Sequence, residues 1–233
     1  MPAVLRPPTT RRARVALVAG AVAAAVLVPI AVGRDGASAD GGPVLAVYGD
    51  SYSAGGRQGG KGDDGWPAIV ADHLDADLRL HAAGGAGYVN GSQARDETFL
   101  DQVQLHPEPQ ADVVVVFGSR NDRELPAAEI KAQAAAMYDA VRTASPSATV
   151  VVIGPQWDDD VAPREMYVTR DAVRSAAVSA GVLFVDALQE GWLFERPQLI
   201  GTDGVHPNDV GHAYLASLIE PLVRDALLGA GIA

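Results

Sequence analysis

From Gly41 onward, the chain alternates short apolar runs with longer stretches that have helical periodicity. Uninterrupted runs of valine, isoleucine and leucine are typical of strands that are covered on both faces of a parallel sheet. Four such runs lie at residues 44–48, 113–117, 150–153 and 182–185, and residues 77–81 form a fifth, weaker candidate.

Between these runs, helices are predicted at residues 66–74, 127–143, 163–180 and 208–228. Pro126 and Pro163 stand where prolines open helices, and Gly181 stands where a glycine closes one. Alternating strands and helices with right-handed crossovers predict an α/β fold, a three-layer α/β/α domain around a central, mostly parallel five-stranded sheet. We expect one such domain over residues 40–233.

The first 39 residues have a different pattern. Arg6, Arg11, Arg12 and Arg14 precede an uncharged 18-residue apolar run over residues 15–32, followed by the small residues of Ala37-Ser38-Ala39. This pattern predicts an export signal that is cleaved before Asp40, or an N-terminal membrane anchor that is retained. Either outcome places the domain in the cell envelope or outside the cell, with membrane contact only through an uncleaved segment.

Charge and composition narrow the classes of function. The net charge is −11, and the five arginines and one aspartate up to Ala39 leave −15 for the remainder. Because such an acidic domain repels phosphate backbones, we expect no nucleic-acid partner. The absence of cysteine excludes disulfides, thiolate metal sites and a cysteine nucleophile.

In open parallel sheets, ligands bind beyond the carboxyl ends of the strands, so polar residues there are the candidates for chemistry. Ser51 follows the first apolar run within Gly-Asp-Ser, and Asn121 follows the third within Gly-Ser-Arg-Asn-Asp. Asp203 and His206 stand three residues apart before the last helix, where a carboxylate can hold an imidazole that faces a nucleophile. Taken singly, Ser51 also suits a capped turn and Asn121 a helix cap.

Serine after the first strand, a glycine turn at residues 82–87, Gly-x-x-Asn after the third strand and Asp-x-x-His before the last helix occur in this order. In this order and placement, the chain resembles the SGNH/GDSL hydrolases, a family of serine esterases and lipases with a flavodoxin-like fold. The resemblance extends from Gly49 to Pro207, over essentially the whole predicted domain.

The resemblance implies that Ser51 is the nucleophile and that Asp203 and His206 complete a catalytic triad. It also implies an oxyanion hole formed by the Ser51 amide, the Asn121 side chain and a glycine amide. That glycine is expected to be Gly85, with Gly84 and Gly87 as competitors. The chain departs from the family at residues 80 and 81, where Leu80 or His81 replaces a frequent asparagine.

The implied reaction is a two-step acyl transfer that needs no metal and no organic cofactor. The expected substrate is a small-molecule or carbohydrate ester with a short acyl group. Trp157 and Trp192 are candidates for stacking on a sugar or lining an acyl pocket, and core packing is the alternative for both.

Three other functions are alternatives to this ester hydrolase. A non-catalytic carbohydrate-binding domain would keep the fold without the activity, and an acyltransferase would use the same triad with another alcohol in place of water. A metallophosphoesterase is disfavoured, because an early Asp-x-His is absent and His206 and His212 alone supply too few ligands. His212 is instead expected to be structural.

Overall fold

The computed structural model describes residues 41–159 and 161–229. The predicted export segment and its boundary at residue 39 lie outside the described residues, so they remain predictions. Within the described ranges, no helix is both long enough and apolar enough to cross a membrane.

The centre of the domain is a parallel sheet of five strands in the order β2-β1-β3-β4-β5. The strands are β1 (Val44–Gly49), β2 (Asp77–Ala82), β3 (Val113–Phe117), β4 (Thr149–Ile153) and β5 (Leu183–Val185). All five predicted runs are therefore strands, including the weak candidate at residues 77–81. The strand order reverses between β1 and β3, which is where open α/β sheets bind their ligands.

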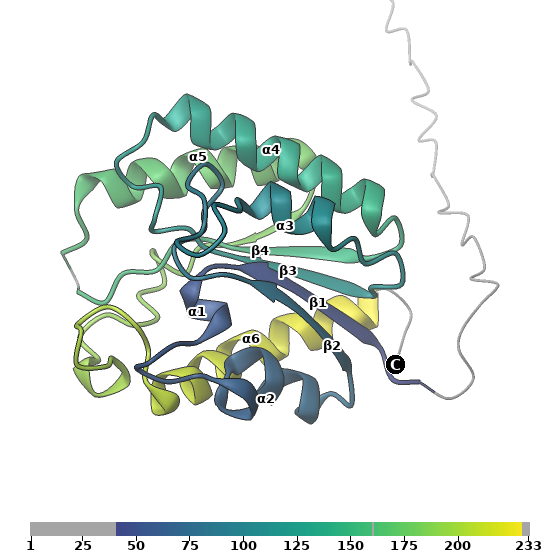
Figure 1. The fold of residues 1–233 in the computed structure, drawn as a ribbon, viewed down its shortest axis with the longest axis horizontal. Helices are drawn as coiled ribbons and strands as arrows, with labels where there is room; N and C mark the ends of the chain where they lie inside the picture. Colours follow the sequence, from purple (N-terminus) through teal and green to yellow (C-terminus); the bar gives the residue numbers. More distant parts are fainter. Residues whose placement is uncertain (1–40, 160, 230–233) are drawn as a thin grey trace, which may run out of the picture. The chain divides into compact units, whose positions relative to one another are not determined.

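Two hydrophobic cores lie on opposite faces of this sheet, because successive side chains of a strand point to opposite sides. Leu45 and Val47 of β1 pack with α2 (Trp66–His73) and α6 (Asp209–Gly229). Ala46 and Tyr48 face the other core, which is covered by α3 (Phe99–Leu105), α4 (Ala127–Ala144) and α5 (Arg164–Ala180). Figure 1 shows the two helical layers on either side of the strands. The predicted three-layer α/β/α architecture is confirmed.

Proline and glycine set the ends of the long helices where the sequence predicts them. Pro126 and Pro163 occupy the position immediately before the first residues of α4 and α5. Gly181 ends α5 in the left-handed conformation with φ +67°, which a residue without Cβ adopts at little cost. These residues therefore determine where α4 and α5 begin and where α5 ends.

Helix α3 was not predicted from the sequence. It has only seven residues, too few for helical periodicity to stand out. Its start is a capping box, in which the Asp101 N–H donates to Thr98 Oγ1 (3.2 Å) and the Thr98 N–H donates to Asp101 Oδ2 (2.9 Å). The buried Gln102 on this helix hydrogen-bonds Gly49 at the end of β1.

His212 is a structural residue, as the sequence analysis predicts. Its side chain is buried at the start of α6, and Nδ1 accepts a hydrogen bond from the N–H of Trp66 (3.4 Å). The backbone of Gly60 packs against the imidazole so closely that a Cβ there would overlap the ring. Burial lowers the pKa of His212 to about 4, so the imidazole is neutral at pH 7.

Candidate active site

Ser51 lies directly beyond the carboxyl end of β1, as the first residue of the short helix α1 (Ser51–Ala54). Asp50 caps this helix, because its Oδ1 accepts a hydrogen bond from the Tyr52 N–H (2.9 Å). The N–H of Ser51 donates to no group within residues 41–159 and 161–229. The hydroxyl and the free amide of one residue are thus available at the edge of the sheet.

The structure brings Ser51 together with His206 and Asp203, from the loop before α6. Ser51 Oγ lies 2.9 Å from His206 Nε2, and His206 Nδ1 lies 2.7 Å from Asp203 Oδ2. Asp203 Oδ1 accepts hydrogen bonds from the N–H groups of Val205 and His206, at 3.0 Å each. Gly204 permits the tight turn between them with φ +68°.

These hydrogen bonds determine the charge of Asp203. Partial burial works against ionisation, but the N–H and the ring of His206, together with the N–H of Val205, lower the pKa of Asp203 to about 2. An ionised carboxylate can only accept hydrogen bonds, so we assign the proton to His206 Nδ1. Nε2 is then left to accept a hydrogen bond from the hydroxyl of Ser51.

The loop after β2 contains Gly84, Gly85 and Gly87, the three candidates for the glycine N–H that donates to the oxyanion. The N–H of Gly87 is engaged, because it donates to the carbonyl of Asn90 (2.8 Å). The N–H groups of Gly84 and Gly85 have no acceptor in the part of the chain that the structure describes. A Cβ on Gly84 would lie 3.9 Å from Cβ of Ser51, whereas Gly85 adopts φ +85°. Gly84 and Gly85 therefore remain candidates for the donor, and Gly87 does not.

Asn121 follows β3 and lies between this loop and Asp50. Its Nδ2 donates to the carbonyl of Ala86 (2.7 Å) and lies 3.5 Å from Asp50 Oδ2. The backbone carbonyl of Asn121 accepts a hydrogen bond from the side chain of Asn90. One amide proton of Asn121 is therefore engaged, and the second is only weakly held.

Asp122 organises the glycine loop, a role that the sequence analysis missed. It is fully buried, and its carboxylate accepts hydrogen bonds from the N–H groups of Tyr88 (2.7 Å), Val89 (3.3 Å) and Asn90 (2.9 Å). The available signal is its place beside Asn121, a few residues after an apolar strand. Asp122 ties the loop after β2 to the end of β3.

Asp50 is also buried, beside the nucleophile, and has fewer donors. Burial raises the pKa of Asp50 to about 7; the Tyr52 N–H lowers it, the nearby Asp122 raises it, and Arg120 lowers it. Protonated and ionised forms of Asp50 are therefore both populated near neutral pH.

The two predicted substrate-binding tryptophans have different surroundings. Trp157, after β4, is half-buried and stacks against the guanidinium of Arg120, whose Cζ lies 4.1 Å from the ring centroid. Trp192 is only 5% exposed in the core between the sheet and α6, and its Nε1 donates to Glu190 (2.7 Å). Its burial in this core fits the packing alternative.

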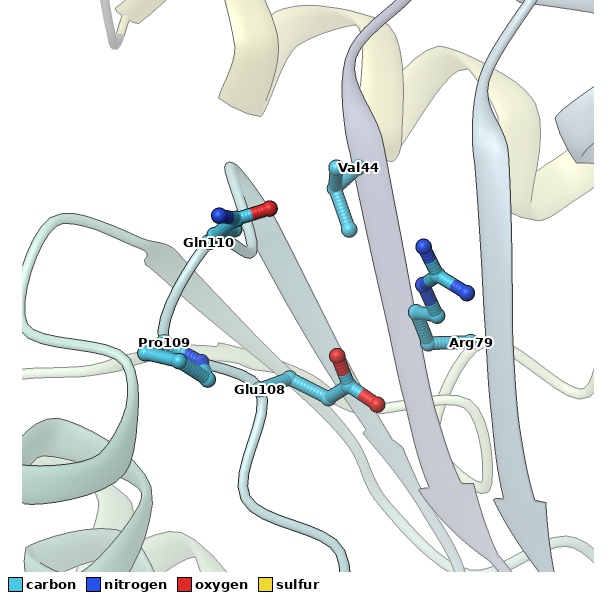
Figure 2. Close-up of a pocket in the computed structure, with 5 residues that line it drawn as sticks. All are labelled: Val44, Arg79, Glu108, Pro109 and Gln110. Carbon is cyan, nitrogen blue, oxygen red and sulfur yellow. The ribbon is translucent and has the colours of Figure 1, made fainter. Parts of the chain in front are cut away.

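A surface pocket and a metal site were the other possible locations for function, and neither coincides with Ser51. The pocket in Figure 2, of about 160 Å³, lies at the amino end of the sheet, where Val44 begins β1 and Gln110 precedes β3. Ser51 lies at the opposite end of β1. Over the described ranges, no group of three or more histidine, aspartate or glutamate side chains is placed to hold a metal ion.

Solved structures share this fold. TesA aligns with a TM-score of 0.63 at 20% identity, over 79% of this chain and 99% of that protein. A family two carbohydrate esterase from Clostridium thermocellum, solved in complex with cellohexaose, aligns with a TM-score of 0.65 at 17% identity, over 83% of this chain and 67% of that one. At these identities, the likeness establishes the fold.

Sequence relationships establish the family. The GDSL lipase Rv0518 of Mycobacterium tuberculosis is 38% identical over 194 residues, covering 79% of this chain and 83% of the relative. The GDSL-like lipase/acylhydrolase family matches residues 47–214, a range that includes Ser51, Asn121 and His206. The resemblance to the SGNH/GDSL hydrolases is confirmed: this chain belongs to the GDSL-like lipase/acylhydrolase family and is a carboxylic ester hydrolase.

Proposed function

We propose that this ester hydrolase works through an acyl-enzyme, with Ser51 as nucleophile, His206 as general base and acid, and Asp203 as the group that orients His206. The observation that carries the proposal is the pair of contacts Ser51 Oγ–His206 Nε2 (2.9 Å) and His206 Nδ1–Asp203 Oδ2 (2.7 Å). These distances lie within the reach that a serine nucleophile and its base require.

In the first step, His206 Nε2 takes the proton of Ser51 as Oγ attacks the carbonyl carbon of the ester. The resulting tetrahedral oxyanion collapses, the bond to the alcohol oxygen breaks, and the alcohol leaves with the proton from Nε2. In the second step, water gives a proton to Nε2 and attacks the acyl carbon, the bond from that carbon to Ser51 Oγ breaks, and Oγ takes the proton from Nε2 as the acid is released. Asp203 stays ionised and stabilises the imidazolium in both steps.

The oxyanion needs hydrogen-bond donors that are not engaged elsewhere. The amide of Ser51 and the amides of Gly84 and Gly85 meet this condition within the described ranges. The second amide proton of Asn121 is the third donor, since it is held only at 3.5 Å by Asp50. We assign the oxyanion hole to Ser51, Asn121 and one of the two glycines.

The proposed substrate is a short-chain ester of a carbohydrate or another small alcohol. The side chains of Asp203 and His206 are 33% and 38% exposed, so the site is open enough for a bulky alcohol portion. Trp157 is half-buried near this edge and can contribute apolar surface. A carbohydrate esterase shares the fold, although at an identity that carries no substrate by itself.

The proposal places the enzyme outside the cytoplasm, from the arginines and the apolar run in residues 1–39. Mass spectrometry of the mature protein tests this placement. A chain that begins at Asp40 indicates cleavage, and an intact chain in the membrane fraction indicates an anchor. An intact chain found only in the cytoplasm would contradict export.

Replacing Ser51 or His206 by alanine should lower kcat for p-nitrophenyl acetate by at least about a thousandfold, because the triad acts as a unit. A fluorophosphonate should label the wild-type protein at Ser51 and leave Ser51→Ala unlabelled. p-Nitrophenyl acetate should be turned over faster than p-nitrophenyl esters with longer acyl chains.

Ser53→Ala is the matched control. Ser53 is a buried serine on the same helix, and its Oγ has no hydrogen-bond partner within the described residues. It should retain activity within a few-fold. Unchanged turnover in a folded Ser51→Ala protein would refute the proposed nucleophile.

Alanine at Gly85 should lower stability, whereas alanine at Gly84 should lower activity. Gly85→Ala requires a side chain at φ +85° and 2.8 Å from Gln93 Cγ, so it should cost about 1–2 kcal/mol of stability or more. Gly84→Ala meets only an ordinary 3.9 Å contact with Ser51, so it should fold normally and slow turnover by crowding the acyl group. Urea unfolding and ester kinetics measure the two effects; equal destabilisation by both would contradict this placement.

Asp50→Asn should change how stability depends on pH. The folded-state pKa of Asp50, about 7, lies above its ordinary value, so the stability that its protonation contributes is present at low pH and is lost as pH rises through 7. Asparagine retains the cap and does not titrate, so the variant should gain stability relative to wild type between pH 5 and pH 8. Thermal unfolding at both pH values measures this gain, and a pH-independent difference would exclude titration of Asp50 as its source.

A further inference from the structure

Tyr52, the residue after the nucleophile, bonds to the loop that carries the base. Its hydroxyl donates to the carbonyl of Val205 at 2.6 Å, across 153 residues of sequence. Val205 lies between Asp203 and His206, and its N–H already donates to Asp203. The Val205 residue is thus held on one side by the carboxylate of its own loop and on the other by α1.

Arg120 is the partner on the other side of this hydroxyl. Its Nη1 lies 3.2 Å from Tyr52 Oη. A phenol has one proton, and the 2.6 Å contact to Val205 uses it, so the oxygen accepts from Arg120. A charged donor strengthens the hydrogen bond that the hydroxyl then makes, because linked hydrogen bonds polarise one another.

The Arg120 side chain is itself fixed on several sides. It is 12% exposed, its Nη1 also donates to Asp158 (3.3 Å), and its guanidinium stacks on Trp157. These two residues follow β4, whereas Arg120 follows β3. We call the series of contacts from Asp158 through Arg120 and Tyr52 to the carbonyl of Val205 the relay. It begins at the ends of β3 and β4 and ends on the loop that carries His206.

We propose that Tyr52 and Arg120 are positioning residues that hold the His206 loop in register with Ser51. The proposal rests on the acyl-enzyme mechanism above. Asp203 orients His206 but belongs to the same loop, so it cannot set the distance from that loop to Ser51. Another tie from Thr202 to Gln58 (2.9 Å) is exposed to solvent, whereas the hydroxyl of Tyr52 lies on a buried side chain next to the nucleophile.

Without this relay, the carbonyl of Val205 loses its partner on α1, and the solvent-exposed contact between Thr202 and Gln58 and the bonds within the loop are left to hold its position. A misplacement of about 1 Å at a reacting group costs on the order of a hundredfold in rate. Tyr52→Phe should therefore lower kcat by about 10- to 100-fold, with KM within about twofold of wild type. Arg120→Met should lower kcat in the same way, and Arg120→Lys, which keeps a charged donor, should recover part of the loss.

Tyr48→Phe is the matched control. Tyr48 is also buried, and its hydroxyl also donates to a backbone carbonyl at 2.6 Å, that of His106. It belongs to the core on one face of the sheet, whereas Tyr52 belongs to the core on the other face. The control should lose comparable stability in urea unfolding and keep the wild-type kcat.

Steady-state kinetics on the full chain, with fluorophosphonate labelling of Ser51, decides between the outcomes. A kcat for Tyr52→Phe equal to that of Tyr48→Phe overturns the proposal. So does a rise in KM at constant kcat in the Arg120 variants, since it would make Arg120 a substrate-binding residue. Loss of kcat that follows the loss of stability in both tyrosine variants would make the role merely structural, and it also counts against the proposal.

A measurement that does not depend on ester turnover tests the positioning role separately from the acyl-enzyme mechanism on which it rests. If wild type shows no Ser51-dependent turnover or labelling, the proposed function fails. The proton on His206 Nδ1 can still be followed by proton NMR. A signal that is shifted or broadened in Tyr52→Phe and unchanged in Tyr48→Phe supports the positioning role, and identical spectra in both variants overturn it.

Discussion

The geometry of the site depends on how closely its neighbours approach the backbone of Gly49. A Cβ at this position would lie 2.8 Å from the carbonyl oxygen of Phe117 and 2.8 Å from Ser53 Oγ. The N–H and carbonyl of Gly49 are both bonded to the buried side chain of Gln102, at 3.1 and 3.0 Å. Gly49 is also in register with Ala82 and Phe117, so β1, β2 and β3 end at one level. The three loops that follow them therefore open at the same edge of the sheet.

Two buried carboxylates then stabilise this edge in different ways. Removing a carboxylate from water is costly unless hydrogen-bond donors replace the water. Asp122 receives three backbone N–H groups from the loop after β2, whereas Asp50 receives that of Tyr52 and a distant contact from Asn121. Asp122 therefore serves as an anchor for a loop, and Asp50 is a cap whose proton is easily gained or lost near pH 7.

Much of this arrangement could be predicted from sequence, because it follows from local patterns. Apolar runs of β-branched residues located the strands, and Pro126, Pro163 and Gly181 located helix ends. The rule that ligands bind beyond the carboxyl ends of parallel strands, together with the resemblance of four ordered motifs to the SGNH/GDSL hydrolases, pointed to Ser51, Asn121, Asp203 and His206. The structure then places these residues within one region, at the distances given above.

The rest depends on contacts between distant segments, which no local pattern encodes. Periodicity could not separate the half-buried Trp157 from the core residue Trp192, because both tryptophans lie outside the helices and strands, where no regular pattern indicates burial. Nor could spacing reveal that the amide of Gly87 is engaged by Asn90. Helix α3 was missed because its capping box spans few residues and its stability comes from burying Phe99 against the sheet.

The residues that hold the site together stand next to those that carry its proposed chemistry. Asp50 and Tyr52 flank Ser51, and Asp122 follows Asn121. In a short helix or tight loop, adjacent side chains point in different directions, so one can face the substrate while the next faces another loop. Asp122 reaches the glycine loop and Tyr52 reaches the His206 loop. A motif such as Gly-Asp-Ser-Tyr thus specifies a reactive group together with the contacts that align its partners, and a substitution beside a reactive residue acts on a loop far away in the sequence.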